Sequence, residues 1–246
     1  MKKTISLSLC LALAAIFLTG CVSIRFEPGS VNSVTGRGDP EMYTFSVGEV
    51  TDIRSELYCD ISYYSAPSDN VTLEIQPNLR EYVTLEESNG ILTLRAGRNI
   101  NFSGKAPVLT VSTPALKSVS QAGAGVFTAH DTITADELTL GLSGAGASKA
   151  DLDVNRLIVN SAGAGDFDLT GRADTASFNL DGAGTINALS LQTRSATVGI
   201  AGVGTVRLSV TDSLSVVADG LGTVEYKGSP VLDISRGGLV TVRNVG

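Results

Sequence analysis

A short motif of two glycines around one small or apolar residue recurs in the C-terminal half of this 246-residue chain. The first glycines of its six copies are Gly123, Gly144, Gly163, Gly182, Gly202 and Gly220. Successive copies lie 18 to 21 residues apart, and a weaker copy, Gly237-Gly238, follows them. A period of this length is typical of repeat architectures, in which each repeat is one unit stacked on the next.

Alignment of the copies on their first glycine separates apolar columns from polar ones. The column four residues before the glycine is apolar throughout: Val119, Leu140, Val159, Phe178, Val198 and Val216. The column four residues after it is apolar in five copies: Phe127, Phe167, Ile186, Val206 and Val224, with Ser148 as the exception. The columns between are mostly polar, so apolar residues alternate with polar ones on both sides of the glycines. Strand-like alternation inside a fixed long period predicts an all-β fold, a parallel β-helix (β-solenoid) with coils of about 19 residues.

The glycine pair falls where the alternation breaks, so we expect it to form a corner of each coil. Glycine tolerates positive φ angles and close approach of other backbone at little steric cost. We also expect the residue between the glycines to point into the corner. Val203 and Leu221 at that position would then widen the later coils.

The N-terminal residues 1–20 have the organisation of an export signal. Lys2 and Lys3 precede a short apolar run over 5–17, which ends in Leu18-Thr19-Gly20-Cys21. This sequence resembles the lipobox of bacterial lipoproteins, and the resemblance implies cleavage before Cys21 and lipidation of its thiol. Acyl chains at Cys21 would anchor the protein to a membrane. Val22, where many inner-membrane lipoproteins have Asp, favours the outer membrane.

The remaining chain divides into three parts. Residues 21–42 are polar and aperiodic, which predicts a flexible tether. Residues 43–113 read as a β-rich N-terminal part with a hairpin turn at Asn89-Gly90. Residues 114–246 hold the Gly-x-Gly repeats. The strands expected in the N-terminal part are 43–47, 53–63, 71–75, 83–85, 91–94 and 108–111.

The charge and the cysteine content limit the partners and the thiol chemistry to be expected of this protein. Loss of Lys2 and Lys3 with the signal changes the net charge from −7 to −9, so nucleic acid is a poor candidate partner. Cys59 would be the only thiol left outside the lipid anchor, so no intramolecular disulfide is expected. Its place among apolar residues predicts burial rather than reactivity.

The glycine-rich stretches do not match a cofactor or metal motif. Gly141 to Gly146 has the glycine spacing of a phosphate-binding loop, but Ala147 stands where that motif needs lysine. Calcium-binding β-rolls need an aspartate soon after the glycines and a nine-residue period, but the column where that aspartate would align, four residues after the first glycine, is apolar in five copies. We therefore expect no cofactor and no metal site.

Asp166 and Asp168 are the strongest candidates for chemistry. They flank Phe167, so both should face solvent about 6–7 Å apart, a separation that suits a glycosidase pair. The alternative is that they are exposed members of a polar ladder, with Asp168 beside Lys149 and Asn187. The single histidine, His130, lies at a turn beside Asp131 and joins no recognisable catalytic set.

Three features together resemble the head GIN domain family of auto-transporter adhesins. They are the block FSVGEVTDIRSELYCDISYYSAPSDNVTLEIQPNLREYVTLEESNGILTLRAG, the segment PVLTVSTPALKSVSQAGAG, and the run of Gly-Ala-Gly coils. The resemblance covers residues 43–246 and implies a right-handed parallel β-helix on an exported protein. It supplies no catalytic or ligand-binding residues.

These observations favour a non-enzymatic cell-envelope lipoprotein that presents a β-helix to a protein or glycan ligand. Two alternatives stay open: a polysaccharide-active enzyme using Asp166 and Asp168, and a structural assembly factor of the envelope. Self-association through the end coils is a further open question. The sequence does not decide between a periplasmic and a cell-surface position.

Overall fold

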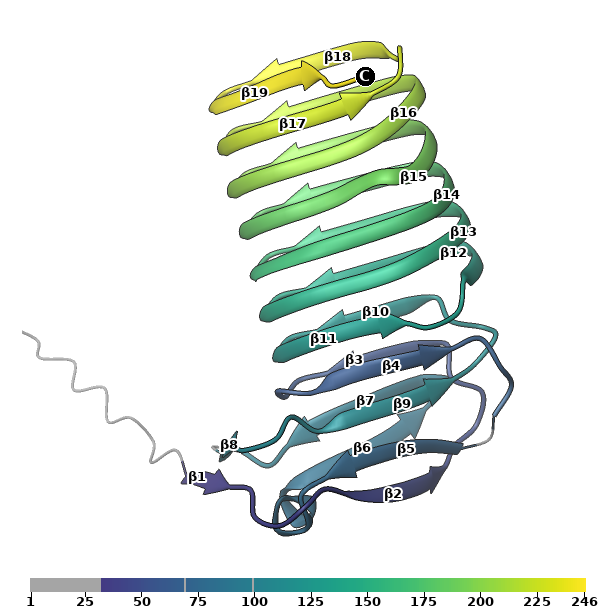
Figure 1. Cartoon of the computed structure of the whole chain (residues 1–246), viewed down its shortest axis with the longest axis vertical. Coiled ribbons are helices and arrows are strands. Elements are labelled where there is room, and N and C mark those ends of the chain that lie inside the picture. Colours follow the sequence, from purple (N-terminus) through teal and green to yellow (C-terminus); the bar gives the residue numbers. More distant parts are fainter. Residues whose placement is uncertain (1–31, 69, 99) are drawn as a thin grey trace, which may run out of the picture. The chain divides into compact units, whose positions relative to one another are not determined.

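The protein is described by a computed structural model over residues 32–68, 70–98 and 100–246. Residues 32–246 form one compact unit, and most of it is a β-solenoid of about seven turns with parallel stacked coils (Figure 1). The predicted all-β solenoid is therefore confirmed. No helix among the described residues is long and apolar enough to cross a membrane.

The solenoid begins after residue 113 and continues to the last coil. Its strands lengthen from four residues at its start to between 16 and 18 residues in the middle coils, where one strand bends around the coil edge without interruption. They are β10 (Ser118–Gln121), β11 (Ala124–Ala129), β12 (Ile133–Leu142), β13 (Ala145–Ser161), β14 (Ala164–Leu180), β15 (Ala183–Ile200), β16 (Val203–Ala218), β17 (Leu221–Lys227), β18 (Val231–Arg236) and β19 (Leu239–Asn244).

Each coil has two flat sides that meet at the glycine corner and at a bend opposite to it. Residues after the glycine pair stack on one side, as in the pairing of Lys149 with Asp168, and residues before it stack on the other, as in the pairing of Val159 with Phe178. We call these sides the following face and the preceding face. The corner glycines stay in register throughout, since Gly146, Gly165, Gly184, Gly204 and Gly222 pair in sequence.

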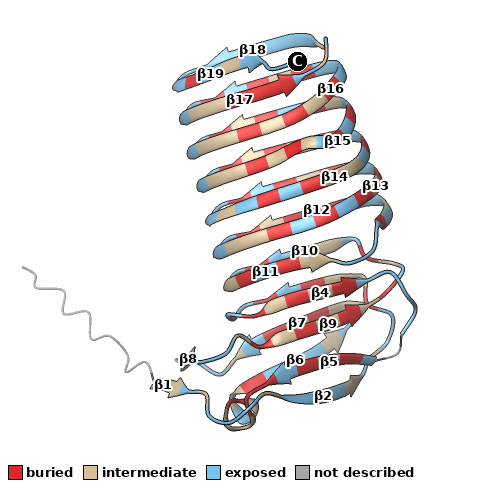
Figure 2. Cartoon of the chain, in the orientation of Figure 1, coloured by how far each residue is buried: buried red, intermediate tan, exposed pale blue. Residues whose placement is uncertain are grey.

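The core consists of the apolar columns predicted from the alignment. Val159 and Phe178 on the preceding face and Phe167 and Ile186 on the following face are almost fully buried. Burial alternates with exposure along much of the long strands β13 to β16 (Figure 2). Each inward column continues as an apolar row through the stacked coils, so small and β-branched side chains fill the narrow interior without tryptophan.

The corner glycines are required by contact between coils. A Cβ atom on Gly163 would overlap the carbonyl oxygen of Gly144 in the preceding coil, and the same holds for Gly182 against Gly163. Positive φ is not the shared reason, because it occurs at Gly146 (157°) and Gly184 (144°) but not at Gly165 between them. The close approach of two backbones explains every pair.

The prediction that the residue between the glycines points into the corner is wrong. Ala145 and Ala164 are exposed, and so are Val203 (54% exposed) and Leu221 (48%). The glycines on each side bring their backbone against the preceding coil, so the residue between them faces solvent. Its size therefore does not alter the cross-section of the coil.

Differences in coil length are absorbed at the bend. The pairing of β14 with β15 shifts between Asp168 and Thr170. That of β15 with β16 shifts twice, between Ala188 and Gln192 and between Thr193 and Ser195. Beyond these shifts the register of the preceding face is regular again. The bend thus accepts an additional residue while both faces and the glycine corner stay aligned.

The N-terminal part closes one end of the solenoid. Its elements are β1 (Asn32–Thr35), β2 (Glu41–Ser46), β3 (Asp52–Ser55), β4 (Asp60–Tyr64), β5 (Asn70–Ile75), η1 (Pro77–Tyr82, a 3-10 helix), β6 (Val83–Ser88), β7 (Ile91–Ala96), β8 (Ile100–Ser103) and β9 (Val108–Ser112). β3 and β4 stack on β10 and β11, whereas β2 pairs with β5 and β6 with β7 in antiparallel fashion. η1 lies at this end with Leu79 buried and Arg80 over the rings of Tyr43 and Phe45 at 5.6 and 5.0 Å.

The structure confirms one detail of the sequence analysis in this part and corrects another. The hairpin turn is confirmed, because Asn89 and Gly90 have φ angles of 54° and 81° and join the antiparallel strands β6 and β7. Residues 32–35, which were assigned to the tether, instead form β1 and pair with β8. Three short polar residues among these four give no periodic signal that would have identified a strand.

Replacement of Gly163 by alanine tests the corner contact. The new Cβ would overlap the backbone of Gly144, and we expect the free energy of unfolding to fall by about 2–4 kcal/mol in urea titrations. The matched control is Ala164→Val, which is exposed and equivalent to Val203 and should leave stability nearly unchanged. Equal stability of the two variants would contradict this account of the corner.

Candidate interaction surfaces

Asp166 and Asp168 lie where the alternation placed them, on the following face of β14 and on either side of buried Phe167. Each carboxylate accepts a hydrogen bond from the next coil. The backbone N–H of Thr185 donates to Asp166 at 2.9 Å, and the side-chain amide of Asn187 donates to Asp168 at 3.1 Å. The pairing of Asp168 with Lys149 and Asn187 is as predicted. Both aspartates thus act as links between coils.

The same behaviour extends along the following face and the bend. The hydroxyls of Thr132 and Thr170 donate to Asp151 at 2.6 and 2.7 Å, and these two hydrogen bonds lower the pKa of that carboxyl. Arg172 binds Asp153 at 2.6 Å. Polar side chains on this side of the molecule are therefore largely engaged with the neighbouring coil above or below.

The most enclosed of these links is a charge cluster near the C-terminal end. Glu225, whose side chain is 11% exposed, lies between Arg207 and Arg243 in one outward column. It accepts a hydrogen bond from Arg207 Nε at 2.7 Å and others from the Arg243 guanidinium. The bonds to Arg243 and then to Arg207 lower the pKa of Glu225. Alternating charge therefore ties three successive coils together.

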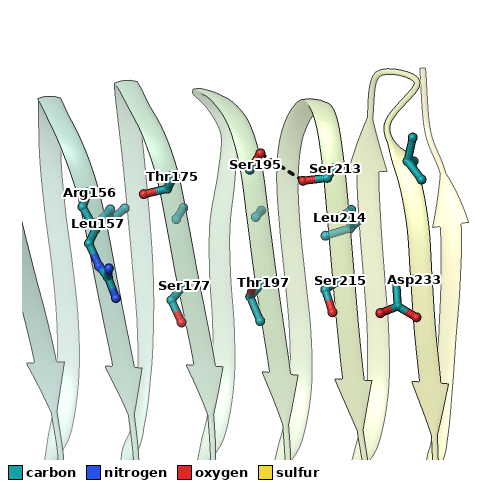
Figure 3. A pocket seen from close by; sticks show the side chains of 13 residues that line it. Arg156, Leu157, Thr175, Ser177, Ser195, Thr197, Ser213, Leu214, Ser215 and Asp233 are labelled. Carbon is teal, nitrogen blue, oxygen red and sulfur yellow. Dashed lines mark hydrogen bonds between the residues drawn. The ribbon is translucent and has the colours of Figure 1, made fainter.

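The preceding face is different, because hydroxyl side chains dominate it. Thr175, Ser195 and Ser213 form one row across β14, β15 and β16, and Ser177, Thr197 and Ser215 form a second row beside it (Figure 3). The two rows line a cleft of about 400 Å³ with buried Ala176, Ala196 and Leu214 between them. Arg156 and Asp233 stand at its two ends, and no charged side chain lies between (Figure 3).

A second cleft, of about 490 Å³, lies on the same face nearer the N-terminal part. Hydroxyl and amide groups of Ser118, Ser120, Thr139, Ser143 and Asn160 line it, together with Arg54. Hydroxyls can both donate and accept hydrogen bonds, and neighbouring coils repeat them at about 4.8 Å. The preceding face therefore presents a repetitive, nearly uncharged hydrogen-bonding surface.

Sequence reasoning singled out the carboxylates and overlooked this surface. A signal was present, because Thr175-Ala176-Ser177, Ser195-Ala196-Thr197 and Ser213-Leu214-Ser215 repeat a hydroxyl–apolar–hydroxyl pattern at one place in successive coils. In the sequence alone, these segments show only alternating polar and apolar columns. Its chemical uniformity becomes evident when the three segments lie side by side.

The other residues considered in the sequence have simple surroundings. Cys59 is buried, and burial raises the pKa of its thiol to about 12, which opposes reactivity. His130 is exposed and stacks on Tyr64 with ring centroids 4.7 Å apart. Within the described ranges, no three His, Cys, Asp or Glu side chains are arranged to hold a metal ion. Cys21 and the signal residues 1–20 lie outside the described residues.

The Glu225 cluster generates a prediction on pH dependence. The folded protein lowers the pKa of Glu225, so its stabilising contribution is full above the ordinary glutamate pKa and is lost as pH falls through the lowered value. We expect the free energy of unfolding to decline more steeply between about pH 5 and pH 3 in the native protein than in Glu225→Gln. Parallel pH profiles, measured by urea unfolding, would exclude this role.

Comparisons with known proteins agree with this architecture. The structure is similar to that of a putative adhesin from Bacteroides fragilis NCTC 9343, with a TM-score of 0.78 and 24% identity over 86% of this chain and 100% of that chain. A putative adhesin from Parabacteroides distasonis ATCC 8503 has a TM-score of 0.63 and 20% identity, covering 87% of this chain and 100% of that one. A putative lipid binding protein from the same organism has a TM-score of 0.63 and 20% identity, covering 86% of this chain and 100% of that one.

At these identities the likeness shows the fold alone. Comparison with curated proteins found no match. The sequence model described as "Putative auto-transporter adhesin, head GIN domain" matches residues 49–230, from the N-terminal strands through β17. The resemblance inferred from the sequence is thereby confirmed, and its adhesin character indicates a protein of the cell envelope or surface. The chain belongs to the head GIN domain family of auto-transporter adhesin-like proteins.

Proposed function

We propose that this protein is a non-enzymatic, lipid-anchored component of the cell envelope that uses its preceding face to bind an extended glycan. The observation that carries the proposal is the double row of hydroxyls from Thr175 to Ser215, which lines an open cleft with charged groups only at its two ends. A polyhydroxylated chain can exchange hydrogen bonds with such rows in either direction. The adhesin character of the family is consistent with a binding role.

The contrast between the two faces supports the choice of surface. On the following face, Asp166, Asp168 and Glu225 already accept hydrogen bonds from neighbouring coils. On the preceding face, the hydroxyl of Ser213 donates to that of Ser195 at 2.9 Å, and the hydroxyl of Thr175 donates to the carbonyl oxygen of Asn155 at 3.4 Å. A ligand hydroxyl can replace such neutral partners. The preceding face therefore offers more groups that can turn to a ligand.

Binding to the cleft can be tested by obstruction. Thr197 is exposed at its centre, so Thr197→Arg should fill the cleft without disturbing the core and should weaken binding by about tenfold or more. The probe is a panel of neutral and acidic polysaccharides, with affinity measured by biolayer interferometry. Thr185→Arg, in the same strand on the following face, is the matched control. Equal loss in both variants would contradict the assignment to the preceding face.

The same panel separates the alternative functions. An enzyme that uses Asp166 and Asp168 would shorten a polysaccharide, and Asp166→Asn would abolish that cleavage. Binding without cleavage, unchanged by Asp166→Asn, is the result we expect. A defined envelope protein complex recovered with the protein, in the absence of glycan binding, would instead favour an assembly factor.

The lipid anchor has its own test. We propose that Cys21 is acylated after removal of residues 1–20 and holds the protein at the outer membrane. Mass spectrometry of the N-terminal peptide should find a diacylglyceryl modification, and Cys21→Ser should release the protein into the soluble envelope fraction. Protease treatment of intact and permeabilised cells then distinguishes surface from periplasmic exposure. An unmodified Cys21 in membrane-bound protein would refute the anchor.

A further inference from the structure

In the described chain, the last coil of the solenoid has unpaired strand edges. β18 pairs only with β16, and β19 pairs only with β17, so each of them has one backbone edge without a described partner. The apolar core also reaches the surface here. Leu232 continues the column of Leu214, yet it is 41% exposed where Leu214 is 1%. The last coil is mostly exposed, unlike the coils before it (Figure 2).

The strands of this coil are related by an approximate internal symmetry. β18 and β19 run in opposite directions on the two faces and meet at Gly238, which stacks on Gly220 (Figure 1). Ile234, four residues before Gly238, continues the buried column of Val216, and Val242, four residues after it, continues that of Val224. Residues equally distant from Gly238 therefore lie at matching positions on the two faces.

We infer that two copies of this chain join end to end through this coil, related by a two-fold axis parallel to the strands. The rotation lays β18 of each copy over β19 of the other in antiparallel orientation, at the spacing of ordinary paired strands. The edge N–H and C=O groups of both strands then find partners. Ile234 faces Val242 of the partner subunit, so the two open cores become one.

Charge complementarity supports this arrangement. Asp233 and Arg243 are outward residues five positions before and after Gly238, so the axis places Asp233 opposite Arg243 of the partner subunit, twice per dimer. Asp233 forms no ion pair with another described residue. The column Arg207, Glu225, Arg243 would then continue into the partner with alternating sign. The last coil, 231–246, carries one Asp and two Arg in a chain of net charge −7, so repulsion between copies is smallest at this end.

Head-to-tail stacking does not fit the opposite end. There η1 covers the core, with Leu79 buried and Arg80 held over Tyr43 and Phe45. An open core at one end and a covered core at the other give a closed dimer rather than a filament. An interface of two six-residue strands per copy is at the small end for protein assemblies, so we expect reversible association.

Sedimentation equilibrium of residues 32–246, the compact unit, tests the dimer across about two orders of magnitude in concentration. Native protein should fit a monomer–dimer equilibrium. Asp233→Arg would place arginine against Arg243 of the partner subunit and should weaken dimerisation about tenfold or more. Asp181→Arg, an exposed site with the same charge change away from this end, should leave dimerisation unchanged.

A charge exchange identifies the orientation. Asp233→Arg and Arg243→Asp should each dimerise poorly alone, whereas their equimolar mixture regains two complementary pairs and should dimerise like the native protein. Circular dichroism verifies that Arg243→Asp still folds despite losing its bond to Glu225. Three outcomes would overturn the inference: a native protein that stays monomeric, association insensitive to Asp233→Arg, or growth beyond dimers.

Discussion

Contact between backbones at the glycine corner determines the rest of this structure. Carbonyl groups of one coil occupy the space where the next coil would place a Cβ atom, so only glycine fits at these positions. Once the corner is in contact, neighbouring strands stay about one strand spacing apart. Every column of side chains on both faces then becomes a row, and each row takes its character from one column of the sequence.

The rows distribute chemistry unevenly over the molecule. Apolar columns make a continuous core, and charged columns on the following face satisfy one another between coils, as in the cluster around Glu225. The hydroxyl columns of the preceding face have fewer such partners and surround the clefts. Links between coils therefore gather on one side of the solenoid, and the hydroxyl-lined clefts lie on the side that we propose as the glycan-binding surface.

The fold could be predicted from the sequence because its period and its alternation agree in every coil. Positions four residues from each first glycine were identified as core, and the structure buries them. The direction of the side chain between the two glycines could not be predicted from the sequence. A residue such as Ala164 or Val203 is compatible with an inward or an outward position until the preceding coil is in place. The sequence did not predict β1 or η1. The residues of β1 pair with the distant strand β8, and those of η1 cover the end of the core, and neither role produces a local sequence pattern.

The solenoid has a polarity set by its N-terminal part. Eleven strands stack on the following face from β2 to β19, which at about 4.8 Å each gives a column about 50 Å long. The first described strand, β1, lies at the η1 end of this column, away from the last coil (Figure 1). Two molecules joined through their last coils would then hold their η1 ends about 100 Å apart and facing opposite ways. The length of such a pair would change only by adding or removing whole coils.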